Sequence, residues 1–283
     1  MSVALTEIAT VVVPVLVPAR TFRNDLRAIK IVWHRDIIRF WRDKPRIVAS
    51  LIQPVLYLFV LGTGLSSMMP AGRGVPLRTF LFPGVISMSV LFTCFFSAGS
   101  LVWDREFGFM REMLVAPVRR GAIVTGKCLG GATAGVLQGA LLITIGGLAG
   151  VPYDPALIIT LLAELLLLSF ALTAFGVLVA VRIKSMQSFM AIIQMFLMPL
   201  FFLSGALFPL NRLPGWLMVL TRLDPLTYAV DPMRRAVFER LSIRAVGVTW
   251  GGTTVPVLAE LGIVAVLSVV ALTAATAQFS RAD

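Results

Sequence analysis

The sequence predicts an all-α integral membrane protein with six transmembrane helices, and three observations carry this prediction. Of its 283 residues, 58% are hydrophobic and 14% are charged, whereas soluble domains carry roughly 25% charged residues. Six stretches are apolar and long enough to cross a bilayer as a helix, which takes about 20 residues. Backbone polar groups in lipid need partners within the same segment, so each stretch should be helical. The stretches are 47–72, 79–103, 128–153, 155–181, 185–210 and 261–280.

The distribution of basic residues predicts the orientation of these spans. With a cytoplasmic N-terminus, the cytoplasmic segments carry 17 of the Lys and Arg residues and the opposite side carries 8. Short cytoplasmic loops are enriched in Lys and Arg, so both termini are expected in the cytoplasm. The net charge of +11 then reflects topology and contact with anionic membrane lipids, and no nucleic-acid partner is expected.

The chain before the first span forms a predicted cytoplasmic segment, residues 1–45, which precedes a transmembrane domain over 46–283. Within 22–42, apolar residues recur three or four positions apart with Arg and Lys between them. This spacing predicts an amphipathic helix that lies in the membrane interface. The helix is either a plain membrane anchor or a surface that carries force or contacts a partner. Its apolar residues are Phe22, Leu26, Ile29, Trp33, Ile37 and Phe40.

The loop 104–120, between the second and third spans, faces the cytoplasm in this topology. It mixes charged residues with apolar side chains that a solvated loop would not need, and Pro117 with Gly121 ends any short helix. Apolar residues exposed together inside a charged rim are typical of a docking surface. A helix end lying against lipid headgroups is the alternative.

Polar residues within the spans are candidates for a substrate path. Glu164 is the only full charge deep in any span, which makes it a functional candidate by default. A protonated carboxyl tied to a neighbouring helix is the alternative. Gln138 and Gln194 are more typical of hydrogen bonds between helices, and the small residues along 130–139 predict that the third span packs closely.

The external loop 209–254 is too long to be structureless, since connections above about 15 residues without structure are uncommon. Its prolines divide it into short pieces, and two short helices that re-enter the outer leaflet are expected. They form either an external gate or a simple lid.

Catalytic and metal-binding patterns are not found in the sequence. His34 is the single histidine, and Cys94 and Cys128 have no metal-ligand spacing. No enzymatic activity, metal or cofactor is therefore expected in this chain.

Two segments of the sequence resemble the ABC-2 type permeases, the membrane subunits of ATP-driven bacterial exporters. The overall pattern is most similar to the daunorubicin-resistance type. The first segment is the cytoplasmic loop and the second runs over 199–235, and both occur in order on a six-span chain. The matching residues are Glu106, Gly108, Glu112, Leu114, Pro117 and Lys127 in the first, and Phe202, Ser204, Gly205, Pro209, Leu213, Pro214, Pro225, Leu226 and Arg235 in the second.

The resemblance implies a fold like that of the type V exporters and a set of partners. A second copy or a related permease completes the membrane unit, and two copies of a separate ATPase bind ATP and magnesium. No G-x-x-x-x-G-K-[ST] phosphate loop occurs in this sequence, so the ATPase must be another chain. The segment 22–42 is similar to the interface helix of the family, and the loop 104–120 is similar to its coupling helix. A bacterial cytoplasmic (inner) membrane is the implied location.

The resemblance also assigns candidate site residues. Glu106 and Glu112 orient the ATPase, and the apolar residues of the loop anchor it. The docking residues are Glu106, Phe107, Gly108, Phe109, Glu112, Met113, Leu114 and Pro117. The candidate residues of the substrate path or gate are Phe202, Ser204, Gly205, Pro209 and Pro225 of the second matching segment, together with Gln138, Glu164 and Gln194, which are candidates because they are polar residues within the spans.

The cargo class follows from the low polarity of the spans. Tyrosine occurs three times and no aromatic ladder for a sugar polymer is visible, which favours a hydrophobic or amphipathic cargo. The resemblance implies that such a cargo, a drug, lipid or secondary metabolite, is moved outward. Export of a glycan or lipid-linked glycan on the same scaffold is the alternative. An ion-coupled secondary transporter is an alternative from another class, and Glu164 would have to carry its coupling.

Overall fold

The computed structural model describes residues 21–64, 76–110, 113, 118–210, 213–243, 247–250 and 252–281. Within these residues, six helices are long and apolar enough to cross a membrane, as predicted. The helices are α1 (Phe22–Arg42), α2 (Lys44–Leu56), η1 (Tyr57–Leu61), α4 (Leu77–Ala98), α5 (Ser100–Glu106), α7 (Arg120–Thr144), η2 (Gly146–Ala149), α8 (Pro155–Ala180), α9 (Met186–Leu203), α10 (Gly215–Leu223), α11 (Thr227–Arg240) and α12 (Val257–Arg281).

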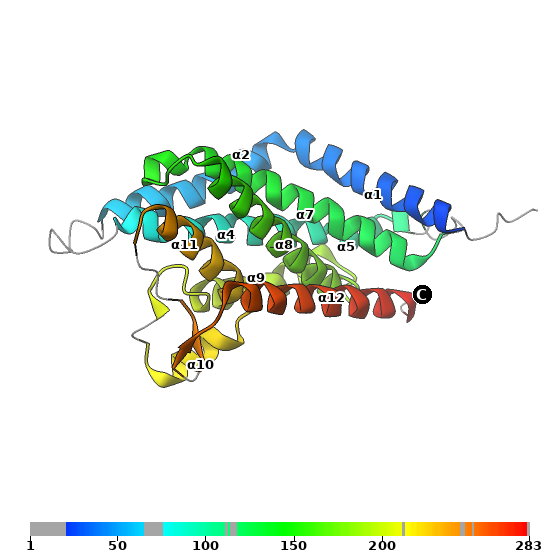
Figure 1. Ribbon diagram of the computed structural model, residues 1–283. Helices are drawn as coiled ribbons and strands as arrows, with labels where there is room; N and C mark the ends of the chain where they lie inside the picture. Colours follow the sequence, from blue (N-terminus) through cyan, green and yellow to red (C-terminus); the bar gives the residue numbers. More distant parts are fainter. Residues whose placement is uncertain are drawn as a thin grey trace, which may run out of the picture.

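The first and last helices share one end of the bundle. The start of α1 and the end of α12 lie at the same end (Figure 1), where Arg120 at the start of α7 donates to the backbone oxygen of Phe279 at 3.1 Å. We call this the loop end, because the described loop residues 104–110 and 118–119 lie there. The opposite end, which carries α10 and a short β-hairpin, is the hairpin end. An even number of spans explains why the two termini of the described chain lie at the same end of the bundle.

The helix α1 occupies the predicted positions, and Asp43 separates it from the first span. The carboxylate of Asp43 caps α2 by accepting a hydrogen bond from the backbone N–H of Arg46 at 3.4 Å. Pro45 falls in the first turn of α2, where a missing N–H costs little. After Pro54 the helix widens into the π-helical turn η1. The chain therefore enters the first span directly from the amphipathic helix.

The helices α4 and α7 form the centre of the bundle. Within the most apolar window of each, 83% of α4–α5 and 67% of α7 is buried, against 17% for α2 and 22% for α9 and α12. The glycines of α7 allow this packing. A Cβ at Gly135 would lie 2.7 Å from Cys94 Sγ of α4, and one at Gly139 would lie 2.7 Å from Leu165 Cδ1 of α8. The predicted close packing of this span is confirmed, and α2, α9 and α12 face outward.

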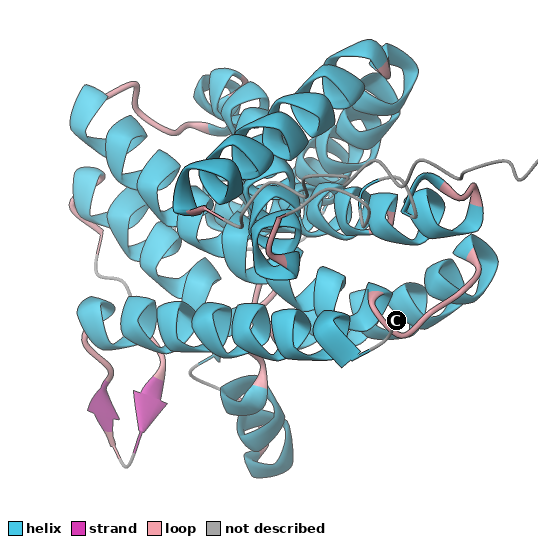
Figure 2. Ribbon diagram, turned by 90° about the vertical axis from the view of Figure 1, so that its right-hand side faces the viewer, coloured by secondary structure: helices cyan, strands magenta, loops and turns pink. Residues whose placement is uncertain are grey.

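At the hairpin end, α10 and α11 confirm that the loop contains two short helices. The strands β1 (Thr249–Trp250) and β2 (Thr253–Thr254) were not predicted; they pair antiparallel and project from the long helices, as a short helix also does (Figure 2). The helix α11 packs against α4, α8 and α12. Its sequence is polar, yet the helix is packed inside the protein. Two of its charged residues, Asp231 and Arg234, are buried and form hydrogen bonds there.

Three predicted span boundaries are wrong, two in the third span and one in the fifth. The third span is Arg120–Thr144 rather than 128–153. It begins earlier because the charge of Lys127 has buried partners. It ends earlier because the chain passes from Thr144 into η2 and then turns at Gly150, which has a φ of +81°. The fifth span ends at Leu203 rather than 210, because Gly205 has a φ of +69°. Such backbone angles favour glycine and stop a helix.

Candidate functional site

A buried ion network joins three helices at the loop end. The side chain of Lys127 on α7 is 1% exposed, and its Nζ lies 2.8 Å from Asp104 Oδ2 and 3.3 Å from Asp36 Oδ1. It also donates to Ser100 Oγ at 2.7 Å. A charge taken out of water is stable only with close partners. The network therefore fixes α1 and α5 against the first turns of α7.

Arg35 completes this network from the α1 side. Its Nη2 lies 2.6 Å from Asp104 Oδ2, and its Nε lies 3.7 Å from Asp36 Oδ1. Burial raises the pKa of Asp36 above its ordinary value, although Lys127 and Arg35 beside it act in the opposite direction. Asp36 Oδ2 has no hydrogen-bond partner among the described residues. Two cations and two carboxylates thus balance each other at this point.

The glycines of α7 let α1 approach closely enough to make these contacts. A Cβ at Gly126 would lie 2.9 Å from Val32 Cβ, and one at Gly130 would lie 2.8 Å from Asp36 Cβ. Trp33 adds a hydrogen bond from its Nε1 to Thr133 Oγ1 at 2.9 Å. The side of α1 that meets the protein is therefore built partly from acidic residues.

The predicted apolar face of α1 is exposed at its start and borders the protein farther along. Phe22 and Leu26 are 75% and 58% exposed, whereas Ile29, Trp33, Ile37 and Phe40 are half-buried. The exposed pair is free to meet lipid, and the half-buried residues border the protein. The two faces expected of an interface helix are thus present, with an additional acidic side that packs on α7.

Both ends of the predicted docking loop are tied to the rest of the protein. At its far end, Asp25 of α1 accepts a hydrogen bond from the backbone N–H of Arg119 at 2.9 Å and pairs with its Nε at 3.4 Å. At its near end, Arg105 donates to the backbone oxygens of Val181 and Ile183 at 2.8 and 3.1 Å. These contacts connect the loop to α1 and to the turn between α8 and α9.

Glu106 makes the contact that reaches α9. Its Oε2 accepts a hydrogen bond from the backbone N–H of Met186 at 3.0 Å, in the first turn of α9. An acidic group here is favoured by the helix dipole. The sequence suggested Glu106 as an orienting charge for a partner, and its observed contact is within the chain.

The tip of the loop exposes aromatic side chains. Phe107 and Phe109 are 70% and 55% exposed, while Met110 is buried. Gly108 between them has a φ of +83°, which favours glycine and turns the two rings outward from the end of α5. Met113 is half-buried and accepts a contact from Arg35 Nη1 at 3.7 Å. Glu112, Leu114 and Pro117, also predicted for docking, lie outside the described residues.

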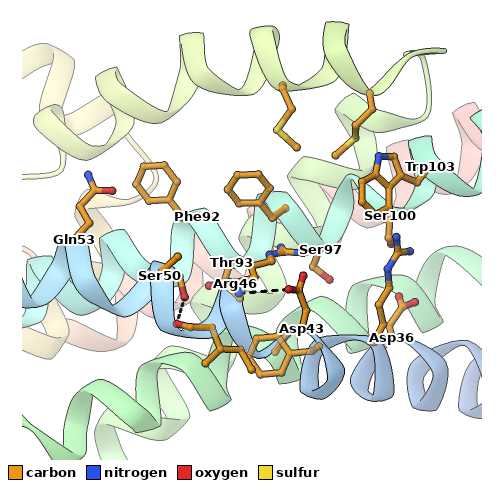
Figure 3. A pocket seen from close by; sticks show the side chains of 18 of the residues that line it. Asp36, Asp43, Arg46, Ser50, Gln53, Phe92, Thr93, Ser97, Ser100 and Trp103 are labelled. Atoms are coloured by element: carbon orange, nitrogen blue, oxygen red, sulfur yellow. Dashed lines mark hydrogen bonds between the residues drawn. The ribbon is translucent and has the colours of Figure 1, made fainter.

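A cavity of about 660 Å³ opens between α1, α2, α4, α5 and α9, next to the ion network (Figure 3). Its volume is in the range of ligand pockets. Charged groups gather at one end, where Asp36, Asp43 and Arg46 line it. Toward the hairpin end the lining becomes apolar, with Pro54, Met88 and Phe92 among its residues. The cavity therefore suits a molecule that has a polar head and an apolar body.

Two arginines at this cavity are held over aromatic rings. The guanidinium of Arg39 lies 4.6 Å from the ring centre of Trp103, and that of Arg46 lies 4.9 Å from the ring centre of Phe96. Such cation–π contacts orient the charge. Neither arginine forms an ion pair within the described part of the chain, so both remain available to an anionic group.

The residues predicted for the substrate path do not meet at this cavity. Gln138 is buried and donates to Ser89 Oγ of α4 at 3.2 Å, and Gln194 is exposed on α9. Phe202 is 48% exposed. None of the eight residues lines this first cavity.

Four of the remaining predicted path residues lie near the hairpin end. Ser204 is buried and bonded to the backbone of α9, and the backbone oxygen of Gly205 accepts from Arg234 Nη2 at 2.7 Å. Pro209 and Pro225 are exposed. These residues shape the turn after α9 and the turn before α11.

Glu164 is buried on α8, and its Oε2 has no hydrogen-bond partner among the described residues. It interacts electrostatically with Glu260 of α12. Glu260 in turn pairs with Arg235 at 3.0 Å, and Arg235 pairs with Asp231 at 2.6 Å. Sequence reasoning singled out Glu164 but missed this cluster, because its other members lie in the predicted external loop and at the end of a span.

The acidic side of α1 was also missed, although a signal existed. Asp25 and Asp36 are 11 residues apart, which is close to three helical turns and places both on one face.

A near match to a phosphate loop, "GAIVTGKC" over 121–128, lies entirely within α7. Its lysine is buried in the ion network, and the segment contains no loop that could surround a phosphate.

Comparison with known proteins identifies the family of the chain. Residues 27–238 match the model of the ABC-2 type transporter family. The chain is 28% identical over 212 residues to the transport permease ycf38 of Cyanophora paradoxa (71% of this chain, 70% of that protein). It is 27% identical over 213 residues to nodulation protein J of Sinorhizobium fredii (74% and 80%), and 28% identical over 209 residues to the inner membrane transport permease YadH of Escherichia coli (73% and 81%). With a family match that runs from α1 into α11, the chain belongs to the ABC-2 type transporter family as a multi-pass membrane permease.

Proposed function

We propose that this permease is the membrane subunit of an ATP-driven exporter, and that a separate ATPase docks on its loop 104–120. One observation carries the proposal: Phe107 and Phe109 are exposed at the tip of a segment whose two ends are tied to the rest of the protein. Exposed aromatic side chains beside charges are typical anchors of protein interfaces. A partner that moves this tip also moves what the ends hold.

The contacts of the loop give the route of that movement. Arg105 holds the end of α8, Glu106 holds the start of α9, and Arg119 is held by Asp25 of α1. Two copies of the ATPase that approach each other on binding ATP and magnesium would pull on these contacts together. The expected response is a rigid-body shift of packed helices.

The same proposal fixes the orientation and the second subunit. The loop end lies on the cytoplasmic side of a bacterial inner membrane, in agreement with the excess of Lys and Arg on that side. A second copy, or a related permease, covers α2 and α9, which are mostly exposed in the single chain. The cavity between α2 and α9 would then open toward the subunit interface.

The cargo is a hydrophobic or amphipathic molecule that enters at the cavity and leaves outward. Arg39 and Arg46 offer charge at the loop end of the cavity, and the remaining lining is largely apolar. Export of a glycan or lipid-linked glycan on the same scaffold is the alternative. An ion-coupled secondary transporter would depend on Glu164, which does not line this cavity.

The test is purification of the tagged permease from its native membrane in mild detergent, with the copurified ATPase activity and subunit ratio as readouts. Phe107→Asp and Phe109→Asp should reduce the bound ATPase several-fold, because they place a charge where an apolar anchor is expected. Since both side chains are exposed, the amount of folded permease should not change.

Leu148→Asp is the matched control, because Leu148 is 65% exposed on η2, away from the loop. It should keep the wild-type amount of ATPase. If the two Phe variants retain full association, the docking role is wrong. If the wild-type permease purifies alone and its transport follows a proton or sodium gradient, the ATP-driven mechanism is wrong as well.

A further inference from the structure

A second cavity of about 530 Å³ lies at the hairpin end, and it is lined by residues farther along α9 than those that line the first. It is lined by α8, α9 and α12 and by the chain from the end of α10 to the start of α11. Leu223 and Val270 line it and are 74% and 55% exposed, so it opens to the surface of the chain. Its volume is within the range for drug-sized ligands.

Asp224 is the one polar residue among the described residues that line this cavity; the others are aliphatic, aromatic or proline. The residue is 6% exposed. Its Oδ1 accepts a hydrogen bond from the backbone N–H of Leu226 at 2.9 Å, and its Oδ2 is buried without a partner in the described chain. A buried carboxylate oxygen without a donor is costly.

The neighbouring basic residue does not fill this role. Arg222 donates through its Nη2 to the backbone oxygen of Thr249 and to the sulfur of Met218, and it forms no ion pair within the residues described. Water is also a poor occupant, since a buried water needs two to four polar partners and this lining offers one polar side chain. The cavity therefore lacks one donor, and that donor has to arrive with an apolar body.

We infer that the second cavity binds an amphipathic amine, whose ammonium group donates to Asp224 Oδ2 while its apolar part lies between α8, α9 and α12. Charge complementarity selects this ligand class: an anionic amphiphile would face an unpaired carboxylate, and a neutral one would leave the carboxylate without a counter-charge. Burial raises the pKa of Asp224 to about 7, which is the expected state of a carboxyl without a cation. The inference does not depend on the ATPase or on the first cavity.

The experiment uses the full-length permease in phosphatidylcholine nanodiscs, whose lipid ammonium carries no N–H. Its thermal stability is measured during titration with dodecylamine, and dodecanol is the neutral probe of the same length. The variant Asp224→Asn keeps an acceptor for the Leu226 N–H and removes the charge. Asp154→Asn is the matched control, because Asp154 also caps its own chain, accepting from Ala156 at 2.8 Å, and lies outside the cavity.

Dodecylamine should stabilise the wild type and Asp154→Asn in a saturable way, and Asp224→Asn should need about tenfold or more amine for the same effect, as expected for loss of a charge-assisted hydrogen bond. Dodecanol should not distinguish the three proteins. Equal amine affinity in Asp224→Asn, or equal stabilisation by dodecanol, overturns the inference. If phosphatidylethanolamine added to the nanodiscs abolishes the amine response, the occupant is a lipid headgroup and the choice of a free amine is wrong.

Discussion

Lys127 and Asp104 form a buried ion pair, with 2.8 Å between Nζ and Oδ2, in which α7 is bound to the helix that leads into the exposed loop. Asp36 joins the same lysine from α1. The lysine is one residue of the pattern by which the sequence resembles its family. Its observed role is to bring three helices together beneath the surface that we propose for the ATPase.

The substitution Lys127→Met should destabilise the permease by about 3–5 kcal/mol, because it leaves Asp36 and Asp104 with only Arg35 as a cation. Thermal unfolding in nanodiscs measures the effect. Adding Asp104→Asn to Lys127→Met should recover part of the loss. Lys30→Met, on the exposed side of α1, is the control, and a similar loss there would contradict the role of the buried pair.

The substitution Gly130→Ala should displace α1 from α7, because the new Cβ would lie 2.8 Å from Asp36 Cβ. We expect a loss of about 1–3 kcal/mol, as for other overpacked sites. Gly262→Ala in α12 meets no atom within 4 Å, and it should be neutral or slightly stabilising, since alanine favours helix. Equal stability of the two variants would show that α1 is not held at this distance.

Asp224 should make the stability of the permease depend on pH. Burial raises its pKa to about 7, whereas an unfolded Asp titrates near about 3.9. The folded chain binds the proton more tightly, so this stabilisation is full at low pH and is lost as the pH rises between the two values. Tyr228 interacts electrostatically with Asp224, and Arg222 and Glu260 act on the same tyrosine.

The wild type should therefore lose thermal stability from about pH 4 to about pH 7, and Asp224→Asn should lose less over the same range. The difference between the two profiles isolates Asp224 from the other titrating groups. Parallel profiles would mean that the carboxyl has a counter-charge in the folded protein.

The first cavity should be reachable by a small thiol reagent. Cys94 and Cys128 are fully buried, so the wild type should react slowly with a membrane-permeant maleimide. Ser97→Cys places a thiol on the cavity wall, and it should react at least several-fold faster. Ala132→Cys is the control, since Ala132 is 1% exposed on α7. Equal rates for the two variants would show that the cavity is closed.

The sequence predicted the elements that can be recognised from residues close together along the chain. The six spans follow from hydropathy, and α1 follows from the spacing of its apolar residues and its basic side chains. The prediction was wrong at the start of α7, because Lys127 looks like a span boundary until its partners Asp36 and Asp104 are known. A charge inside a helix can be recognised as buried only when residues far away in sequence are brought beside it.

The candidate site was predicted only in part for the same reason. The exposed Phe107 and Phe109 belong to the predicted loop, whereas the two cavities depend on how α9 stands relative to its neighbours. Asp224 sits in a turn of the external loop, where an acid is usually solvated and a helix cap is its ordinary role. Nothing in its local sequence distinguishes it from Asp154, which is half-exposed.

The helix α9 forms part of the wall of both cavities. Met186 and Met190 near its start line the first cavity, and Phe196, Pro199 and Leu203 farther along line the second. Close-packed helices shift as rigid bodies, so a displacement of α9 moves a wall of both cavities. Because Glu106 is bonded to the N-terminal turn of α9, a pull on the exposed loop reaches the walls of both cavities through one helix.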